Sequence, residues 1–516
     1  MSQQVVTFSI SAPGFAGLNL QDSPVDLPAN WALEANNCII DKSGRVAARK
    51  GWTKAHSSSN SDLSTSNVTC IGELVQTDGT ATTVCTGGAF LFKLASATTL
   101  TTLTYGGGGV APTISASNWQ FCFLNGVAMF WQEGYDPLIY DPAISATTFR
   151  RLNEKAGTAG TIYQCNTAIA AYGRVWAAST ASDKSTVVWS DLLTPHIWTG
   201  GTAGSLDLRN VWPSGGDEVV AMAAHNSYLF IFGRNQILIY EGADVPATMR
   251  LKDSIVGIGC ITRDSVQNIG EDVWFLSDTG VRSLLRTIQE KSAPIRQISK
   301  NVHDDLMMYL NTETLANIKS GFSAVNSLYL LTMPAGDITY CFDTRQMLED
   351  GSARATKWVG AESTAFYETK SRKFYLGKAG YIGEYAGYLD DASTYRMTYY
   401  TTWIDFGDQV RKTILKKSRL ICIGGNDQVV SVKWAYDFGN SYFSENVTIP
   451  TSSFSAQYNV SQYNTTAQYS SSTTVNLLSS NGLSQGQVLQ FGFETDMNNN
   501  AFSVQKIDLL TKNGRV

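Results

Sequence analysis

The sequence predicts an all-β chain with few short helices, built as a β-propeller and a second β-rich unit made from both chain ends. Three observations predict this class. Charged residues form only 16% of the chain, against the ~25% usual in soluble proteins, which leaves few for long solvated helices. Glycine and tyrosine are frequent, with 44 and 23 copies, as turns and strands require. A strand–turn–strand pattern also repeats along the middle of the chain.

Overall charge and hydrophobic runs limit the environment of the chain. A net charge of −5 and a pI of about 5.5 argue against a broad basic face that holds nucleic acid. No stretch reaches the ~20 apolar residues of a membrane span. The first residues, MSQQVVTFSI, lack the basic and apolar regions of a signal peptide. We therefore expect synthesis and folding in a cytoplasm.

The eight cysteines are scattered, and no two are spaced as Cys-x-x-Cys. The spacing indicates neither a zinc site nor a disulfide framework. Most of them lie in apolar runs, such as Cys122 and Cys422, where a free cysteine acts as a small hydrophobic residue. We expect buried, reduced thiols.

The repeated pattern is a short apolar or aromatic strand, a tight polar turn and a second strand. The turns contain Gly, Asp, Asn and Pro, and the flanking runs are rich in Val, Ile, Phe, Tyr and Trp, as hairpins require. The copies span residues 82–94, 127–141, 174–191, 227–242, 272–285, 327–343 and 372–387.

The spacing of the copies predicts a propeller over residues 61–389. Successive turns are roughly 40–60 residues apart, which suits four strands in each blade. Stacking the units in a closed ring removes the open sheet edges that a linear array would leave. We predict seven blades, with six as the alternative. Neither the Trp-Asp dipeptide of WD40 blades nor a regular kelch Gly-Gly pattern is present.

One interval is longer because of a short helical insertion, expected at residues 299–319. Ser299 is a suitable N-cap, and Val302, Leu306 and Leu310 recur at helical spacing. A second short helix is expected to follow, with Leu315 on its apolar side.

We predict that the C-terminal segment, residues 390–516, forms a separate β region. Within it, residues 446–490 contain no Asp, Glu, Lys or Arg. Such low complexity is typical of disorder, but the alternating Tyr, Val and Phe favour strands against another protein surface. We expect an ordered, assembly-facing extension. The strands of this region are predicted at Met397–Phe406, Arg419–Ile423, Val429–Tyr436 and Phe502–Leu510.

The N-terminal segment, residues 1–60, is turn-rich and contains two expected local elements. Asn30 would cap a helix of one to two turns at Trp31–Asn36. Cys38–Ile40 and Arg45–Arg49 would form a hairpin around the turn Asp41–Gly44, because a short glycine-containing turn favours that connection.

A family resemblance rests on specific positions in this opening segment. They are Gly14, Leu18-Asn19, Pro24, Leu27-Pro28, Glu34-Ala35-Asn36-Asn37, Gly44-Arg45 and Arg49-Lys50-Gly51-Trp52. They resemble the opening of the tail nozzle proteins of short-tailed bacteriophages, also called tail hub or tail tubular B proteins. Residues 225–242 and 256–281 are similar to two blades of that family. The resemblance covers roughly residues 10–400, and the last 120 residues match only as a generic β domain.

The resemblance implies a structural protein of the virion. Members of the family form a homo-hexameric ring at the distal end of the tail, around the channel through which DNA leaves without specific binding. Each subunit has a β-propeller and a platform domain that joins the N- and C-terminal segments, here residues 1–60 with 390–516. The ring docks on an adaptor ring on its proximal side, and fibres or spikes and a tip protein attach nearby.

Two sets of residues are candidates for roles in such an assembly. Trp31, Arg45, Arg49 and Trp52 would support the platform fold or its ring contacts, since buried aromatics and arginines often anchor interfaces; a purely intradomain role is the alternative. A basic run could meet phosphates in a channel or an acidic neighbouring ring, or it could be a solvated strand face. That run consists of Arg411, Lys412, Lys416, Lys417 and Arg419.

Known catalytic, cofactor and metal motifs are not found in the sequence. It contains no phosphate-binding loop, no Gly-x-Ser-x-Gly and no His-Glu-x-x-His, and Gly106–Gly109 is followed by Val-Ala-Pro rather than by a helix. The four histidines are not paired at metal-ligand spacing. We therefore expect no enzymatic activity, cofactor or metal.

An alternative remains because propellers often act on glycans, and catalysis there needs two facing carboxylates. Asp141, Asp191, Asp278 and Asp343 lie at or just after hairpins, where turn chemistry explains aspartate equally well. Alternatives to the virion protein are thus a glycan-active or glycan-binding propeller, or a cytoplasmic propeller scaffold that binds peptides.

Overall fold

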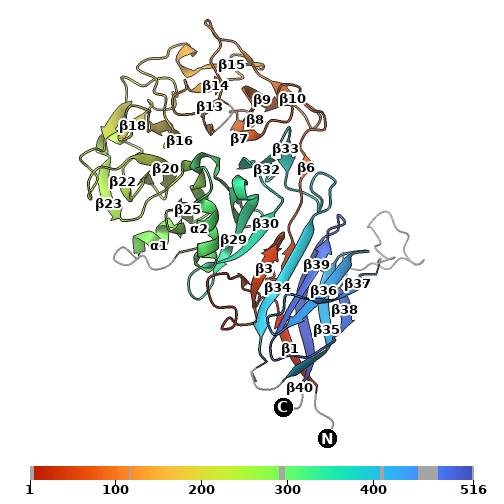
Figure 1. The fold of residues 1–516 in the computed structure, drawn as a ribbon. Coiled ribbons are helices and arrows are strands. Elements are labelled where there is room, and N and C mark those ends of the chain that lie inside the picture. Colours follow the sequence, from red (N-terminus) through yellow and green to blue (C-terminus); the bar gives the residue numbers. More distant parts are fainter. Residues whose placement is uncertain (1–4, 116–117, 290–296, 407–411, 451–474, 514–516) are drawn as a thin grey trace.

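The computed structural model describes residues 5–115, 118–289, 297–406, 412–450 and 475–513. Figure 1 shows a ring of small sheets that turns once around a centre, and beside it two longer sheets that contain strands from both ends of the chain. Within the described residues, no helix is long and apolar enough to cross a membrane.

The first four blades each have a sheet whose strands follow one another outwards from the centre. In blade two, β11 is an added strand, parallel to β15. The strands are β7 (Val68–Val75), β8 (Ala81–Gly87), β9 (Phe90–Leu94) and β10 (Leu100–Thr102); β11 (Thr104–Tyr105), β12 (Gln120–Leu124), β13 (Val127–Trp131), β14 (Leu138–Tyr140) and β15 (Thr148–Arg151); β16 (Thr167–Ala171), β17 (Arg174–Ala178), β18 (Thr186–Trp189) and β19 (Gly204–Asp207); β20 (Val219–His225), β21 (Tyr228–Gly233), β22 (Gln236–Glu241) and β23 (Arg250–Val256).

The last three blades complete the ring. The outermost strand of blade seven comes from the N-terminal segment, since β6 pairs with β33. Their strands are β24 (Gln267–Ile269), β25 (Asp272–Ser277) and β26 (Gly280–Ser283); β27 (Lys319–Ser323), β28 (Leu328–Met333), β29 (Ile338–Met347) and β30 (Ala353–Val359); β31 (Phe366–Glu368), β32 (Phe374–Gly377), β33 (Ile382–Glu384) and β6 (Thr53–Lys54).

Neighbouring blades pack along their inner strands, and blade seven returns to β7 of blade one. The ring therefore closes with seven blades among the described residues, and the predicted all-β propeller class is confirmed. Local sequence explains each hairpin. In blade two, β13 is a fully buried Val-Ala-Met-Phe-Trp run, and Asn125 and Gly126 before it both have positive φ, as a tight hairpin turn requires.

The helical insertion is only partly as predicted. The first helix, α2 (His303–Leu310), is present, and a 3-10 turn (Lys300–Val302) precedes it. The second is wrong, because only the 3-10 turn Leu315–Asn317 follows. Ser299 does not cap the helix; its Oγ accepts the N–H of Val281 instead. A further short helix, α1 (Leu284–Gln289), follows blade five and was not expected.

Two longer sheets form what we call the terminal sandwich. One contains β1, β4, β5, β35, β38 and β40, and the other contains β2, β3, β34, β36, β37 and β39. Their bounds are β1 (Val6–Ser11), β2 (Gly17–Leu18), β3 (Trp31–Asn36), β4 (Cys38–Ile40), β5 (Val46–Ala48), β34 (Arg396–Ile404), β35 (Thr413–Gly424), β36 (Val429–Tyr436), β37 (Phe443–Thr448), β38 (Val475–Asn481), β39 (Leu489–Asp496) and β40 (Phe502–Asn513).

Both chain ends build this sandwich. N-terminal β1 and β5 pair with C-terminal β40, and β3 pairs with β34. The second sheet also continues into blade six, because Asn36 of β3 pairs with Lys357 of β30. Sandwich and propeller thus share one sheet of ten strands.

The predictions for the N- and C-terminal segments are confirmed in part. The Cys38–Ile40 hairpin and the four C-terminal strands are confirmed. The helix at Trp31–Asn36 is wrong, since these residues form β3, and Asn30 donates from Nδ2 to the carbonyl of Gly14 instead of capping a helix. Within the charge-free stretch, Val475–Asn481 form β38 and residues 482–488 connect it to β39, while residues 451–474 lie outside the described residues.

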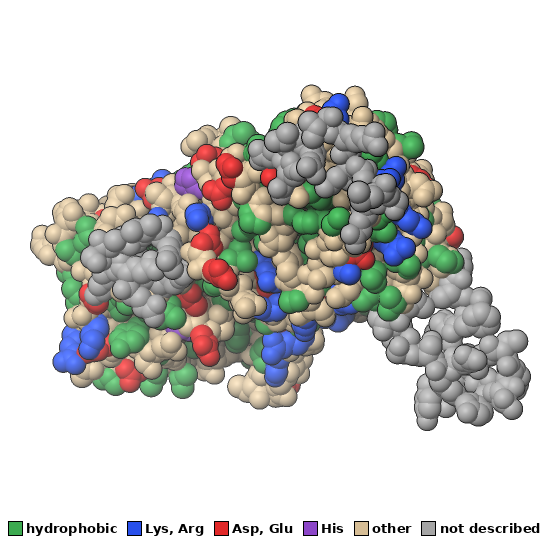
Figure 2. Space-filling view, turned by 90° about the horizontal axis from the view of Figure 1, so that it is seen from below, with side chains coloured by type: hydrophobic (Ala, Val, Ile, Leu, Met, Phe, Trp, Pro, Cys, Tyr) green, Lys and Arg blue, Asp and Glu red, His purple; other side chains and the backbone are tan. Residues whose placement is uncertain are grey.

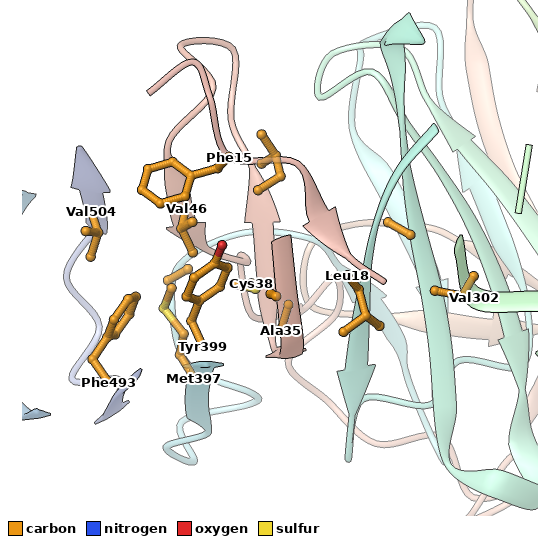
Figure 3. Packing of buried hydrophobic residues seen from close by; sticks show 14 of the residues in the cluster. Phe15, Leu18, Ala35, Cys38, Val46, Val302, Met397, Tyr399, Phe493 and Val504 are labelled. Atoms are coloured by element: carbon orange, nitrogen blue, oxygen red, sulfur yellow. The ribbon is translucent and has the colours of Figure 1, made fainter. Parts of the chain in front are cut away.

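The core of the sandwich is aromatic and aliphatic (Figure 3). Phe15 contacts Tyr399 edge-on at 5.9 Å between ring centroids, and Tyr399 stacks on Phe493 at 5.7 Å. The same apolar cluster reaches Val302 beside helix α2, so the core continues from sandwich to propeller. All eight cysteines are free and buried, as predicted.

Candidate functional site

The inner strands of the propeller surround a cavity of about 500 Å³. Its wall includes Trp119 and Tyr367 as well as four charged residues, Glu368 of the last blade and the central group of Arg263, Asp264 and Lys319. Arg263 and Asp264 belong to a 3-10 turn before blade five (Arg263–Ser265), and Lys319 is the first residue of β27. Burial of charge at the centre of a propeller requires compensating partners.

The three charges compensate one another. Lys319 Nζ lies 2.5 Å from Asp264 Oδ2, and Arg263 Nε lies 3.4 Å from Asp264 Oδ1. Burial raises the pKa of the Asp264 carboxyl, but Lys319 and Arg263 outweigh it and hold that pKa below its usual value. The carboxylate therefore stays ionised at neutral pH.

Arg263 and Lys319 also donate hydrogen bonds to residues of other blades across the central cavity. Arg263 donates to Asn166 Oδ1 at 3.0 Å and to the carbonyl of Asn118. Lys319 donates to Asn118 Oδ1 at 2.9 Å. Because Asn118 and Asn166 precede blades two and three, the bonds tie these blades to blades five and six. We call these five residues, Asn118, Asn166, Arg263, Asp264 and Lys319, the hub.

A second buried polar cluster lies where the chain passes between sandwich and propeller. The chain enters through residues 49–52 and returns through 385–395, and we call these two segments the neck. They are hydrogen-bonded to each other: Trp52 N–H donates to the Leu389 carbonyl at 3.0 Å, and Asp391 N–H donates to the Trp52 carbonyl at 2.9 Å. A Cβ at Gly51 would lie 1.9 Å from the Leu389 carbonyl oxygen, so this close approach requires glycine.

Arg49 is the centre of the neck, with a side chain 2% exposed. Its Nη1 and Nη2 donate to the two carboxylate oxygens of Asp390 at 2.9 and 2.6 Å, and its Nε donates to Asn37 Oδ1 at 2.9 Å. The guanidinium carbon lies 3.9 Å from the ring centroid of Tyr395. Burial opposes the charge of Arg49, yet the Asp390 contacts outweigh it and raise the guanidinium pKa.

Lys378 of the last blade also packs at the neck. Its ammonium lies 5.4 Å from the ring centroid of Trp52 and donates to the carbonyl of Ala361 at 3.2 Å. Burial, together with repulsion from Arg49, lowers the pKa of Lys378 to about 8. Two cations, Arg49 and Lys378, thus interact with the carboxylate of Asp390.

The other candidates from the opening segment lie apart from this cluster. Arg45 pairs with Asp41 at 2.6 Å and closes the β4–β5 turn, with 22% of its side chain exposed. Trp31 begins β3 and is partly buried. Of the four residues, the structure brings Arg49 and Trp52 together at the neck.

In the basic run, Lys412 lies just before β35, and Lys416, Lys417 and Arg419 lie within it, while Arg411 lies outside the described residues. Lys412 and Lys416 are exposed, whereas Lys417 and Arg419 are partly buried on the outer side of the strand. Arg419 is opposite Asp508 of β40. Figure 2 shows Lys and Arg side chains scattered among hydrophobic and uncharged ones on the face it presents.

The aspartates considered for catalysis are held by local partners. Asp141 pairs with Lys155, Asp343 pairs with Arg345 at 2.7 Å, and Asp191 accepts from Thr202 Oγ1 at 2.5 Å. Asp278 lies in the turn between the second and third strands of blade five, whereas Asp141 and Asp191 follow third strands, at the opposite end of their blades.

All five hub residues and Asp390 were missed from sequence. Their partners are distant along the chain: 201 residues separate Lys319 from Asn118, and 341 separate Arg49 from Asp390. A charged residue at the first position of an apolar inner strand, as in Lys319-Ser-Gly-Phe, was the one available signal. Within the described ranges, no three His, Cys, Asp or Glu side chains gather as they would around a metal ion.

No family model and no curated protein matches this sequence. Among solved structures, the chain is similar to the extracellular domain of a one component system from B. thetaiotaomicron, with 12% identity and a TM-score of 0.39, covering 66% of this chain and 40% of that one. It is similar to YCF48 from Cyanidioschyzon merolae, with 14% identity, TM-score 0.38, and 65% and 99% covered. It is also similar to the Neurospora crassa Pan2 WD40 domain, with 10% identity, TM-score 0.36, and 66% and 98% covered. At these identities the likeness concerns the fold alone.

Proposed function

We propose that this chain is a non-enzymatic structural protein of a short-tailed phage, a subunit of the ring at the distal end of the tail. The observation that carries the proposal is the pairing of N-terminal β1, β3 and β5 with C-terminal β34 and β40. The resemblance of residues 14–52 to tail nozzle proteins implies a platform built in that way. The terminal sandwich would be this platform.

In this function the neck and the hub would make the subunit rigid. A ring that holds DNA under pressure needs subunits that do not bend between their two units. The buried Arg49–Asp390 pair and the sheet shared by β3 and β30 resist such bending. The hub ties blades across the propeller, and Arg263 spans its channel. DNA would therefore pass through the lumen of the ring, without specific binding, rather than through a propeller.

The proposal includes a homo-hexamer, an adaptor ring on the proximal side, and fibres or spikes and a tip protein as neighbours. The protein would be made in the host cytoplasm and reside in the virion tail. We propose no catalytic role because Asp141, Asp191 and Asp343 are each engaged by a neighbouring side chain, which leaves no free carboxylate pair for glycoside hydrolysis among these candidates.

Immunogold electron microscopy tests the proposal directly. Antibody to this chain is applied to phage particles from the source culture, with antibody to a capsid protein as the matched control. Label at the distal tail tip is the expected result. Label found only on material that sediments apart from particles would reject a virion role.

A second function is favoured by one observation, the cavity of about 500 Å³ at the centre of the propeller. Its aromatic walls beside charged groups suit a small polar ligand such as a glycan. A binding propeller or a cytoplasmic scaffold would be monomeric and absent from particles. Glycan-array binding that is lost in Lys319→Met but kept in the exposed control Lys412→Met would favour this alternative.

A further inference from the structure

The sheet of the terminal sandwich that contains β35 and β40 has two lateral strands with uncharged sequences. Among the described residues, β1 pairs with β40 alone and β38 pairs with β35 alone. β1 reads Val-Thr-Phe-Ser-Ile-Ser and β38 reads Val-Asn-Leu-Leu-Ser-Ser-Asn. Natural edge strands are usually protected by charged residues, proline or bulges, and these two sequences contain neither charge nor proline.

The backbone of β1 presents alternate groups to its open side. Ala12 N–H donates to the Gln505 carbonyl at 2.9 Å, so residues an even number of positions before it also face β40. The N–H and C=O groups of Thr7 and Ser9 therefore point away from the sheet. The neighbouring side chain of Val6 is 54% exposed, and a cavity of about 510 Å³ opens beside it.

The backbone of β38 does the same on the opposite side. Gly482 N–H donates to the Lys416 carbonyl at 3.1 Å, which places the even-numbered residues toward β35. Leu477 and Ser479 therefore direct their N–H and C=O groups outwards. The side chains of Val475 and Leu477 are 67% and 60% exposed.

The two edge strands run antiparallel to each other and lie at the same position along the sheet. β1, β40, β35 and β38 alternate in direction across the sheet (Figure 1), so β38 runs antiparallel to β1. One row of the ladder joins Ser11, Lys506, Ile421 and Leu477. The edges thus lie at the same height on opposite sides of one sheet.

We propose that copies of this chain associate by strand addition, with β38 of one copy against β1 of the next. The new pair is antiparallel, as the other pairs of the sheet are, and it joins open N–H and C=O groups on both sides. Because different edges meet, the contact is head-to-tail, and repeated head-to-tail contacts close into a ring when the rotation permits. This inference rests on the proposed ring function, for which it names the subunit contact.

Lysine substitutions on the two edges test the contact, because a charge on an edge strand opposes addition. Leu477→Lys and Thr7→Lys change exposed side chains, so the fold should persist, as circular dichroism can verify. Leu251→Lys is the matched control: Leu251 is 41% exposed and lies on β23, the outermost strand of blade four. Oligomers are measured by analytical ultracentrifugation and negative-stain electron microscopy.

Each edge variant should weaken association at least tenfold, and Leu251→Lys should match the wild type. The doubly changed chain Leu477→Lys with Ser11→Glu should regain rings, because Ser11 is exposed and lies level with Leu477, so that opposite charges then meet across the contact. Rings that resist both edge variants would overturn the proposal, as would a wild-type chain that remains monomeric at about 100 µM. A response to the β38 change alone would show a two-fold β38–β38 contact instead.

The outcomes separate this inference from the function it rests on. Tail-tip label together with rings that are insensitive to edge charges would reject strand addition and leave the virion role. Edge-dependent rings without any label on particles would reject the virion role and leave strand addition.

Discussion

Arg49 and Asp390 form a two-point ion pair between segments that lie 341 residues apart in sequence, with N–O distances of 2.9 and 2.6 Å. One residue lies where the chain enters the propeller and the other where it returns. The pair therefore closes the propeller at the point where it joins the terminal sandwich. Tyr395 covers the guanidinium and donates from its hydroxyl to the Arg49 carbonyl, and the Arg49 side chain is only 2% exposed.

Arg49→Ala should lower the free energy of unfolding by about 3–5 kcal/mol, because it leaves the Asp390 carboxylate, only 14% exposed, without its partner. Arg49→Lys should retain only part of the free energy of unfolding that Arg49→Ala loses, since an ammonium cannot make the two-point contact. Urea denaturation measures both. Arg49→Ala should also reduce tail assembly, and normal infectious particles would contradict the assembly role.

A double-mutant cycle is the control for this prediction. If the pair acts as a unit, Asp390→Ala added to Arg49→Ala should cost far less than the sum of the single changes. Additive losses would mean that each residue contributes through other contacts, such as the bond from Arg49 to Asn37.

Periodicity and turn chemistry predicted the fold well where contacts are local. The alternation in Val429–Tyr436 gave a strand with those bounds, and the short turn at Asp41–Gly44 gave the β4–β5 hairpin. Seven hairpin repeats correspond to seven blades because each hairpin is a self-contained signal.

The predictions were wrong or missing where the local structure depends on a partner that is distant in the sequence. Trp31–Asn36 contains good helix formers, Ala, Leu and Glu, yet pairing with β34 places it in a sheet; tertiary context overrides such a weak propensity. The hub was not predicted, for a related reason. Nothing near Lys319 in sequence indicates Asp264 or Asn118, which only closure of the ring brings within 2.9 Å of its ammonium.

The hub should be sensitive to loss of its single carboxylate. Asp264→Ala leaves Lys319 and Arg263 buried close to each other without a counter-charge, so the free energy of unfolding should fall by about 3–5 kcal/mol. Asp278→Ala, at an exposed turn of the same blade, is the matched control and should change stability by less than ~0.5 kcal/mol. Equal effects of the two changes in chemical denaturation would mean that the hub does not stabilise the ring.

The cysteine thiols should be unreactive in the native protein. All eight are buried, and burial raises the pKa of Cys260 to about 11 and that of Cys70 to about 12. Little thiolate therefore exists at pH 8, and reagents need the thiolate. Titration with Ellman's reagent should find no fast-reacting thiol in the native chain and all of them after denaturation. A native thiol that reacts within seconds would contradict this burial.

Closure of blade seven by β6 depends on a neutral histidine. His56 follows β6 and is fully buried. Its Nδ1 donates to the Ser58 carbonyl at 2.9 Å, since a carbonyl can only accept, and its Nε2 accepts the Ile382 N–H at 3.3 Å. A second ring proton would remove that acceptor. Burial accordingly lowers the pKa of His56, and Lys54 lowers it further.

This arrangement predicts a loss of stability on the acid side. An unfolded histidine titrates near pH ~6.5, whereas folded His56 binds its proton only at lower pH. Its contribution is therefore complete above pH ~6.5 and falls below it, by at most about 1.4 kcal/mol per pH unit until the folded pKa is reached. Urea denaturation at several pH values should show the wild-type stability falling toward that of His56→Gln as pH decreases. His225→Gln, at a partly exposed position, is the control, and a stability difference between wild type and His56→Gln that stays constant from pH 7.5 to 5 would contradict the neutral state of the ring.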